Sequence, residues 1–130
     1  MVQIERFAAD APERPRSYSQ AVRYGSLIIT AGHLAAQPEI EVSIEEQTRS
    51  ALRELLATVE RAGGSAGSIL RINAYLGTMD DFDAYDGVYR EVIGLEERPT
   101  RTTVQIGGFK VPYLVEVDAI AVALDNSPLT

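Results

Sequence analysis

The sequence has no cysteine, and His33 is its only histidine. The absence of cysteine excludes disulfides, thiolate nucleophiles, iron–sulfur clusters and cysteine zinc sites. A single histidine prevents one chain from building a metal site out of several imidazoles. Nucleotide-binding glycine motifs are also missing, because neither GxxxxGK[ST] nor GxGxxG occurs. We therefore expect neither a metal ion nor a cofactor.

Positive charge is scarce in the chain. Its 130 residues include 12 Lys and Arg against 19 Asp and Glu, which gives a net charge of −7, and Lys110 is the only lysine. A protein of this charge repels polyanions, so nucleic acids are not expected as partners.

Long hydrophobic runs are absent too. The longest uncharged stretch, Ser26–Pro38, is too short to cross a bilayer. The first ten residues include Glu5 and Arg6 and lack the apolar core of a signal peptide. These features predict a cytoplasmic protein with no membrane partner.

The apolar positions predict one domain, residues 1–130, with the element order β-β-α-β-α-β-β. Both helices are amphipathic, so each can cover a sheet from one side. This pattern predicts an α+β sandwich with two helices on one face of a mixed sheet. The expected elements are a hairpin (Tyr18–Arg23 and Ser26–Ala31), helices at Ile44–Ala62 and Asp80–Ile93, and strands at Ile69–Leu76, Thr102–Ile106 and Leu114–Leu124.

Three local patterns add detail to this prediction. Ser43 precedes Glu46 by three residues, the spacing of a capping box at a helix start. In the strand Ile69–Leu76, alternation places Leu70 on the buried face. The last strand is apolar on both faces in its second half, so we expect its uncovered face to pack against another subunit.

These patterns indicate a fold class but no particular reaction. Metalloprotease and nucleophile-elbow motifs do not occur, and what remains is a set of polar residues at unusual places. Arg101 opens a strand after a proline turn, which by itself is typical of an exposed arginine. Glu116 lies inside the most apolar strand, where it is either solvated or buried in a cleft beside a cation such as Arg101 or a ligand.

Several stretches together resemble the RidA/YjgF family, in order and over about residues 15 to 122. They are YSQAVRYGSLIITAG (Tyr18–Gly32), YLGTMDDFDAYDGVY (Tyr75–Tyr89), PTRTTV (Pro99–Val104) and LVEVDAIAV (Leu114–Val122). The resemblance implies a chorismate-mutase-like fold and a homotrimer whose sheets form a central barrel. It also implies ligand clefts between subunits and hydrolysis of 2-imino or 2-enamino acids to 2-keto acids and ammonia.

Site residues carry over from the family position by position. The resemblance implies that Arg101 binds the substrate carboxylate, that Glu116 positions water, and that Tyr18 and Thr103 line the cleft. A planar carboxylate suits the guanidinium fork, and a glutamate can act as general base.

The chain departs from the family pattern at several of these positions. Ala31-Gly32-His33 replaces the usual SGQ beside the ligand, with loss of the serine hydroxyl, and Asp86 stands where the family often has asparagine. An anion at 86 opposes an anionic substrate unless it is protonated, paired or turned away. His33 either bonds to backbone in place of the glutamine or serves as a catalytic acid–base.

Other functions remain open at this level. The same scaffold suits a specialised pathway enzyme acting on another nitrogenous or carboxylated molecule, or a non-catalytic module that binds a small ligand. Ribonuclease activity, which is attributed to some relatives, fits poorly with the charge of −7.

Overall fold

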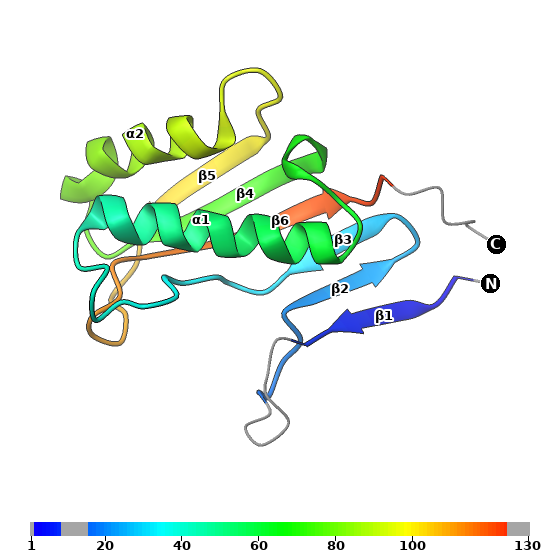
Figure 1. The fold of residues 1–130 in the computed structure, drawn as a ribbon. Helices are drawn as coiled ribbons and strands as arrows, with labels where there is room; N and C mark the ends of the chain where they lie inside the picture. Colours follow the sequence, from blue (N-terminus) through cyan, green and yellow to red (C-terminus); the bar gives the residue numbers. More distant parts are fainter. Residues whose placement is uncertain (1, 9–15, 125–130) are drawn as a thin grey trace.

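The computed structural model describes residues 2–8 and 16–124, which form one mixed sheet and two α-helices (Figure 1). The strands follow the order β1-β2-β3-β6-β4-β5 across the sheet, and β4 and β5 are its parallel pair. The elements are β1 (Ile4–Phe7), β2 (Ala21–Tyr24), β3 (Leu27–Thr30), α1 (Ile44–Arg61), β4 (Ile69–Leu76), α2 (Phe82–Ile93), β5 (Thr100–Gln105) and β6 (Val115–Val122), with 3-10 turns at Ala66–Ser68 and Met79–Asp81.

Helix α1 begins at the predicted capping box. The Ser43 hydroxyl accepts from the Glu46 N–H (3.0 Å), and the Glu46 carboxylate accepts from the Ser43 N–H (3.1 Å). The apolar stripe behind this cap is fully buried, including Leu52, Leu55 and Val59. The expected helix is therefore confirmed, and it ends one residue early, with Ala62 as its C-cap.

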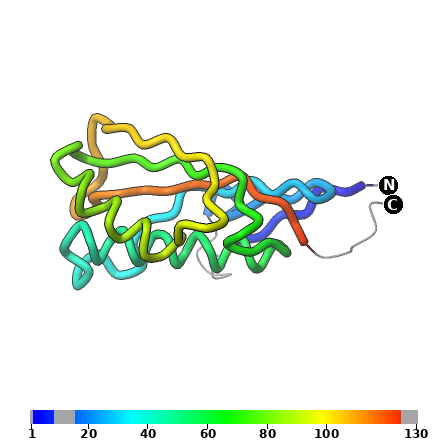
Figure 2. The backbone as a smooth tube through the Cα atoms, turned by 90° about the horizontal axis from the view of Figure 1, so that it is seen from above, coloured from blue at the N-terminus to red at the C-terminus, as the bar shows by residue number. Residues whose placement is uncertain are grey.

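Both helices cover the same face of the sheet (Figure 2). The core lies between them and the central strands, where Val115, Val117 and Ala119 of β6 are at most 2% exposed. The alternate residues of β6 face the other way and are half-buried. The predicted α+β arrangement of two helices on one face of a mixed sheet is thus confirmed.

The sequence prediction missed strand β1 at the sheet edge. Its four residues pair antiparallel with Ala21–Tyr24, yet most of them are exposed. An exposed edge strand has no buried side to mark, so its sequence carries little alternation. The predicted order of elements therefore lacked one N-terminal strand.

The prediction that Leu70 lies on the buried face of its strand was also wrong. The ladder between β4 and β6 shifts register between Ile69 and Arg71, and Leu70 is 51% exposed. A bulge of this kind inserts one residue and reverses the alternation beside it. Alternation alone cannot reveal where such an insertion falls.

The face of the sheet opposite the helices is open in the single chain. Ile29 pairs with Ile120, Leu27 pairs with Val122, and the exposed fractions of Leu27 and Ile29 are 41% and 50%. An apolar open face suits contact with another protein surface.

Among the described residues no helix is long and apolar enough to cross a membrane.

Candidate active site

Arg101 and Glu116 lie on opposite faces of the sheet. Arg101 is paired across the parallel ladder with Ile72, which is fully buried beneath the helices. Glu116 is paired with Tyr75 and sits between the buried Val115 and Val117, so it points to the open face. One chain therefore presents two separate groups of site residues.

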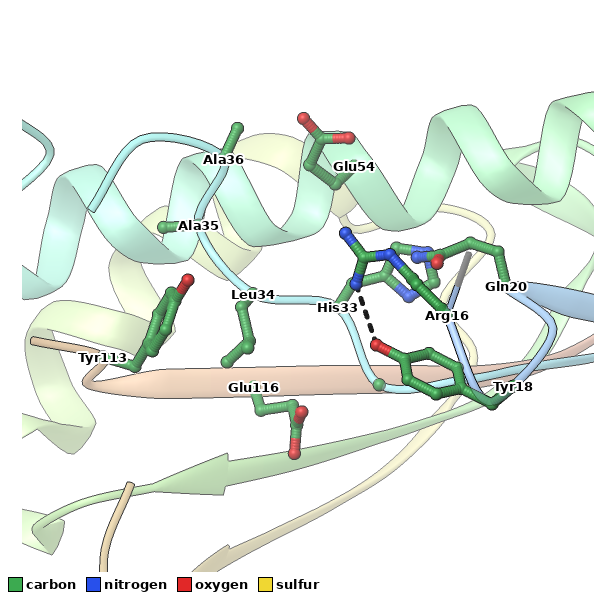
Figure 3. A pocket seen from close by; sticks show the side chains of 11 residues that line it. Arg16, Tyr18, Gln20, His33, Leu34, Ala35, Ala36, Glu54, Tyr113 and Glu116 are labelled. Carbon is green, nitrogen blue, oxygen red and sulfur yellow. Dashed lines mark hydrogen bonds between the residues drawn. The ribbon is translucent and has the colours of Figure 1, made fainter. Parts of the chain in front are cut away.

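The first group surrounds a cavity of about 370 Å³, here called the Glu116 cavity. The loop after β3 forms one wall, and Glu116 projects from β6 beneath it (Figure 3). The lining residues are Arg16, Tyr18, Gln20, Gly32, His33, Leu34, Ala35, Ala36, Glu54, Tyr113 and Glu116.

The loop residue Gly32 lies directly against the Glu116 side chain. A Cβ at this position would stand 2.6 Å from Glu116 Oε2, so only glycine fits without moving the carboxylate. The approach is fixed by a β-bridge in which the His33 N–H donates to the Val117 carbonyl (2.7 Å) and the Val117 N–H donates to the His33 carbonyl (3.0 Å). The loop Ala31–His33 is thus hydrogen-bonded directly to β6.

The carboxylate of Glu116 is half-buried and has no ion pair or side-chain hydrogen bond with any residue that the structure describes. Burial raises its pKa, and the charge of Asp118 on the same face adds to the rise. The Asp118 carboxylate itself accepts two hydrogen bonds, one from the Asn73 side-chain amide and one from the Tyr75 hydroxyl, each with a length of 2.9 Å. A carboxylate with a raised pKa and free oxygens can accept a proton from a bound water.

His33 is buried, with an exposed fraction of 3%. Its Nδ1–H donates to the Ala31 carbonyl (2.8 Å), so Nε2 is left to accept from the Thr58 hydroxyl (2.8 Å), with the Gln20 amide nitrogen 2.7 Å away. Burial lowers the pKa of the ring, which favours the neutral form. These bonds hold the ring against the backbone of the Ala31-Gly32 loop.

Tyr18 stands at the mouth of the Glu116 cavity and is half-exposed. Arg16 Nη1 donates to its hydroxyl over 2.9 Å, as the dashed line in Figure 3 shows. Sequence reasoning missed Arg16, Gln20 and Tyr113 as lining residues. No motif marks them, because Arg16 and Gln20 flank Tyr18 in one segment and meet Tyr113 only in the fold.

The second group lies at the sheet edge, where Arg101 is the second residue of β5 and lies beneath α2. The Arg101 guanidinium lies over three aromatic rings, at 4.6 Å from Tyr89, 5.4 Å from Tyr85 and 5.6 Å from Phe82. A cavity of about 290 Å³, here called the Arg101 cavity, adjoins it. Its lining residues are Asp86, Tyr89, Arg90, Gly94, Leu95, Arg98, Pro99 and Arg101.

Asp86 pairs with Arg101 rather than opposing it. Arg101 Nη1 donates to Asp86 Oδ1 (2.7 Å), and Arg90 Nε donates to Oδ2 (2.9 Å). The bond from Arg101 is the largest cause that lowers the pKa of Asp86, so this carboxyl is ionised and paired. Of the outcomes considered for an anion at position 86, the structure shows the paired one.

Thr103 lies behind Arg101 on the same face of β5. Its hydroxyl is 3.0 Å from the Tyr85 hydroxyl, within the aromatic group that supports Arg101.

In the described part of the chain, no group of three or more histidine, aspartate and glutamate side chains could hold a metal ion. Arg101 and Glu116, the two charged residues expected from the sequence, thus lie on separate faces of the sheet.

Comparison with known sequences finds relatives that all belong to one protein family. The profile of the family described as Endoribonuclease L-PSP matches residues 8–123. A RutC family protein of Pyrococcus abyssi is 33% identical over 119 residues, which cover 88% of this chain and 93% of that protein. The Escherichia coli protein TdcF, named as a candidate reactive intermediate deaminase, is 31% identical over 86% of this chain and 91% of its own length.

Solved structures share the fold. A member of the YjgF/YER057c/UK114 family from Mycobacterium tuberculosis superposes with a TM-score of 0.82 at 26% identity, over 93% of this chain and all of that one. A YjgF family protein from Neisseria meningitidis gives the same TM-score at 24% identity, over 95% and 97% of the two chains.

Proposed function

The chain belongs to the RidA/YjgF/L-PSP family, and from this membership we propose that it hydrolyses reactive 2-imino acids to 2-keto acids and ammonia. The observation that carries the proposal is the pair of half-sites on opposite faces of the sheet. Each half supplies one of the two groups that this hydrolysis needs, a carboxylate anchor and a base.

Arg101 is the proposed anchor for the substrate carboxylate. The aromatic rings beneath its guanidinium and the bond to Asp86 fix its orientation, and Asp86 occupies only Nη1. The remaining N–H groups can donate to a carboxylate and so fix the position of the neighbouring imine carbon. Asp86 therefore orients Arg101 without using all of its donors.

Glu116 is the proposed general base. A water between it and the imine carbon adds to that carbon and gives its proton to Glu116. Glu116 returns this proton to the nitrogen and then takes the hydroxyl proton as the C–N bond breaks and a C=O bond forms. Glu116 finally passes that second proton to the departing ammonia. The overall change converts a protonated imino acid and water into a 2-keto acid and ammonium.

The two groups can meet only if two protomers join. We propose a homotrimer in which the open sheet faces form a barrel and the Arg101 edge of one protomer meets the Glu116 cavity of the next. The exposed Leu27 and Ile29 on the open face supply apolar surface for this contact. His33, buried and bonded through both ring nitrogens, is proposed to position the loop at Gly32 rather than to transfer protons.

Two other functions compete with this proposal. A specialised enzyme on another carboxylated substrate would use the same anchor, and the altered positions Ala31, His33 and Asp86 favour it. A non-catalytic binding module would need Arg101 but has no use for a half-buried Glu116 that lacks a partner among the described residues. Ribonuclease activity is the weakest fit, because the chain has a charge of −7.

The proposed function is tested by measuring hydrolysis of imines that are generated in the assay mixture. An amino acid oxidase with catalase generates the imino acid, and semicarbazide captures whatever imine survives. We expect the protein to speed keto acid release and to reduce the captured imine. Unchanged capture for every imine tried, with a folded protein, would contradict the deaminase proposal.

A further inference from the structure

Three guanidinium groups gather around the Arg101 cavity. Arg90, Arg98 and Arg101 line it, and among the residues that the structure describes Asp86 is the only acidic one that does so. The net charge of this lining is therefore +2, in a chain whose net charge is −7. A positive cavity on an acidic protein is typical of a site for an anion.

Asp86 satisfies only two of the three arginines. It bonds to Arg101 and Arg90, whereas the side chain of Arg98 has no hydrogen bond or ion pair with the residues that the structure describes. Two nearby acids, Glu91 and Glu97, lie against residues outside the cavity lining. Glu91 accepts two bonds from Arg49, and the Glu97 carboxylate lies close to Gly67, 2.9 Å from where a Cβ would stand.

Arg98 and Arg101 are spaced to act together. Three residues of extended chain span at most about 11 Å, and both side chains line the same cavity. Pro99 and Tyr89 also line this cavity, and the buried Tyr89 hydroxyl has no partner within the described residues. Burial raises the pKa of Tyr89 to about 12, so the hydroxyl keeps its proton and can donate.

We infer that the Arg101 cavity recognises a substrate with two acidic groups, a 2-imino dicarboxylic acid whose 2-carboxylate binds Arg101 and whose distal carboxylate binds Arg98. A dicarboxylate cancels the +2 charge of the lining, whereas a monocarboxylate leaves Arg98 unpaired. The inference rests on the proposed function for the imine group. The recognition of two acids can be tested apart from it.

Binding of two stable keto acids tests the inference directly. We expect calorimetry to show 2-oxoglutarate binding about 10-fold or more tightly than 2-oxobutanoate, because a second charge-assisted contact forms. Arg98→Gln should remove this preference and change 2-oxobutanoate binding less than about twofold. Arg53→Gln, the same charge change at an exposed position of α1, should keep the preference.

Three results would overturn the inference: equal affinities for the two acids, a preference that survives Arg98→Gln, or binding of neither acid. Hydrolysis of the corresponding imines separates this inference from the proposed function. A binding preference without hydrolysis contradicts the deaminase proposal alone. Hydrolysis without a preference for the dicarboxylate contradicts the inference alone.

Discussion

Replacing Arg101 with alanine is expected to lower kcat/KM for imine hydrolysis by about 100-fold or more. The substitution removes the charged donors that fix the substrate carboxylate, and hydrogen bonds to charged groups are worth about 1.5–3 kcal/mol each. It also releases Asp86 from a 2.7 Å bond, which leaves a carboxylate facing an anionic substrate. The initial rate of keto acid formation at low imine concentration measures this effect.

Two controls distinguish an anchor from a structural arginine. Arg101→Lys keeps the charge without the planar fork and should recover part of the activity. Asp86 keeps its bond to Arg90 in both variants, so thermal unfolding should show folded proteins. An Arg101→Ala protein with activity within about twofold of the native protein would remove Arg101 from the site.

Replacing Glu116 with glutamine is expected to lower kcat by about 100-fold with little change in KM, the range found when a general base is lost. Glutamine has the same shape, so the close contact with Gly32 is preserved. Glu60→Gln, the same charge change at an exposed position of α1 outside the cavity, is the matched control and should leave kcat unchanged.

The pH profile identifies which group acts as base. Glu116 works in its ionised form, so activity should rise with pH through a pKa that burial and Asp118 raise above the ordinary glutamate value. Glu116→Gln should abolish this rise. His33→Gln should keep it, because the ring is neutral and bonded to the protein; its loss in His33→Gln would assign the base to His33 instead.

Much of the fold was predictable because its elements bury one face. The stripe of α1 and its capping box are local patterns, and both were confirmed. Strand β1 was missed because its stability comes from pairing with Ala21–Tyr24 rather than from burial. The bulge at Leu70 was missed because register depends on the neighbouring strand and not on the strand's own sequence.

Only part of the candidate site could be predicted from the sequence. Resemblance to the family pointed to Arg101 and Glu116, but strand alternation in separate strands does not say that their faces are opposite. The pairing of Asp86 with both Arg90 and Arg101 needed the packing of α2 over β5. Arg98 carried no motif, and its importance follows only from the cavity that it lines.

Mixing two inactive variants tests the central claim, that each site takes Arg101 from one protomer and Glu116 from another. Arg101→Ala and Glu116→Gln chains would be unfolded, combined in equal amounts and refolded together, beside each variant refolded alone. Random assembly gives about one quarter of the sites both native groups, so activity should return to about a quarter of the native value. Mixed assemblies no more active than the separate variants would contradict a site shared between protomers.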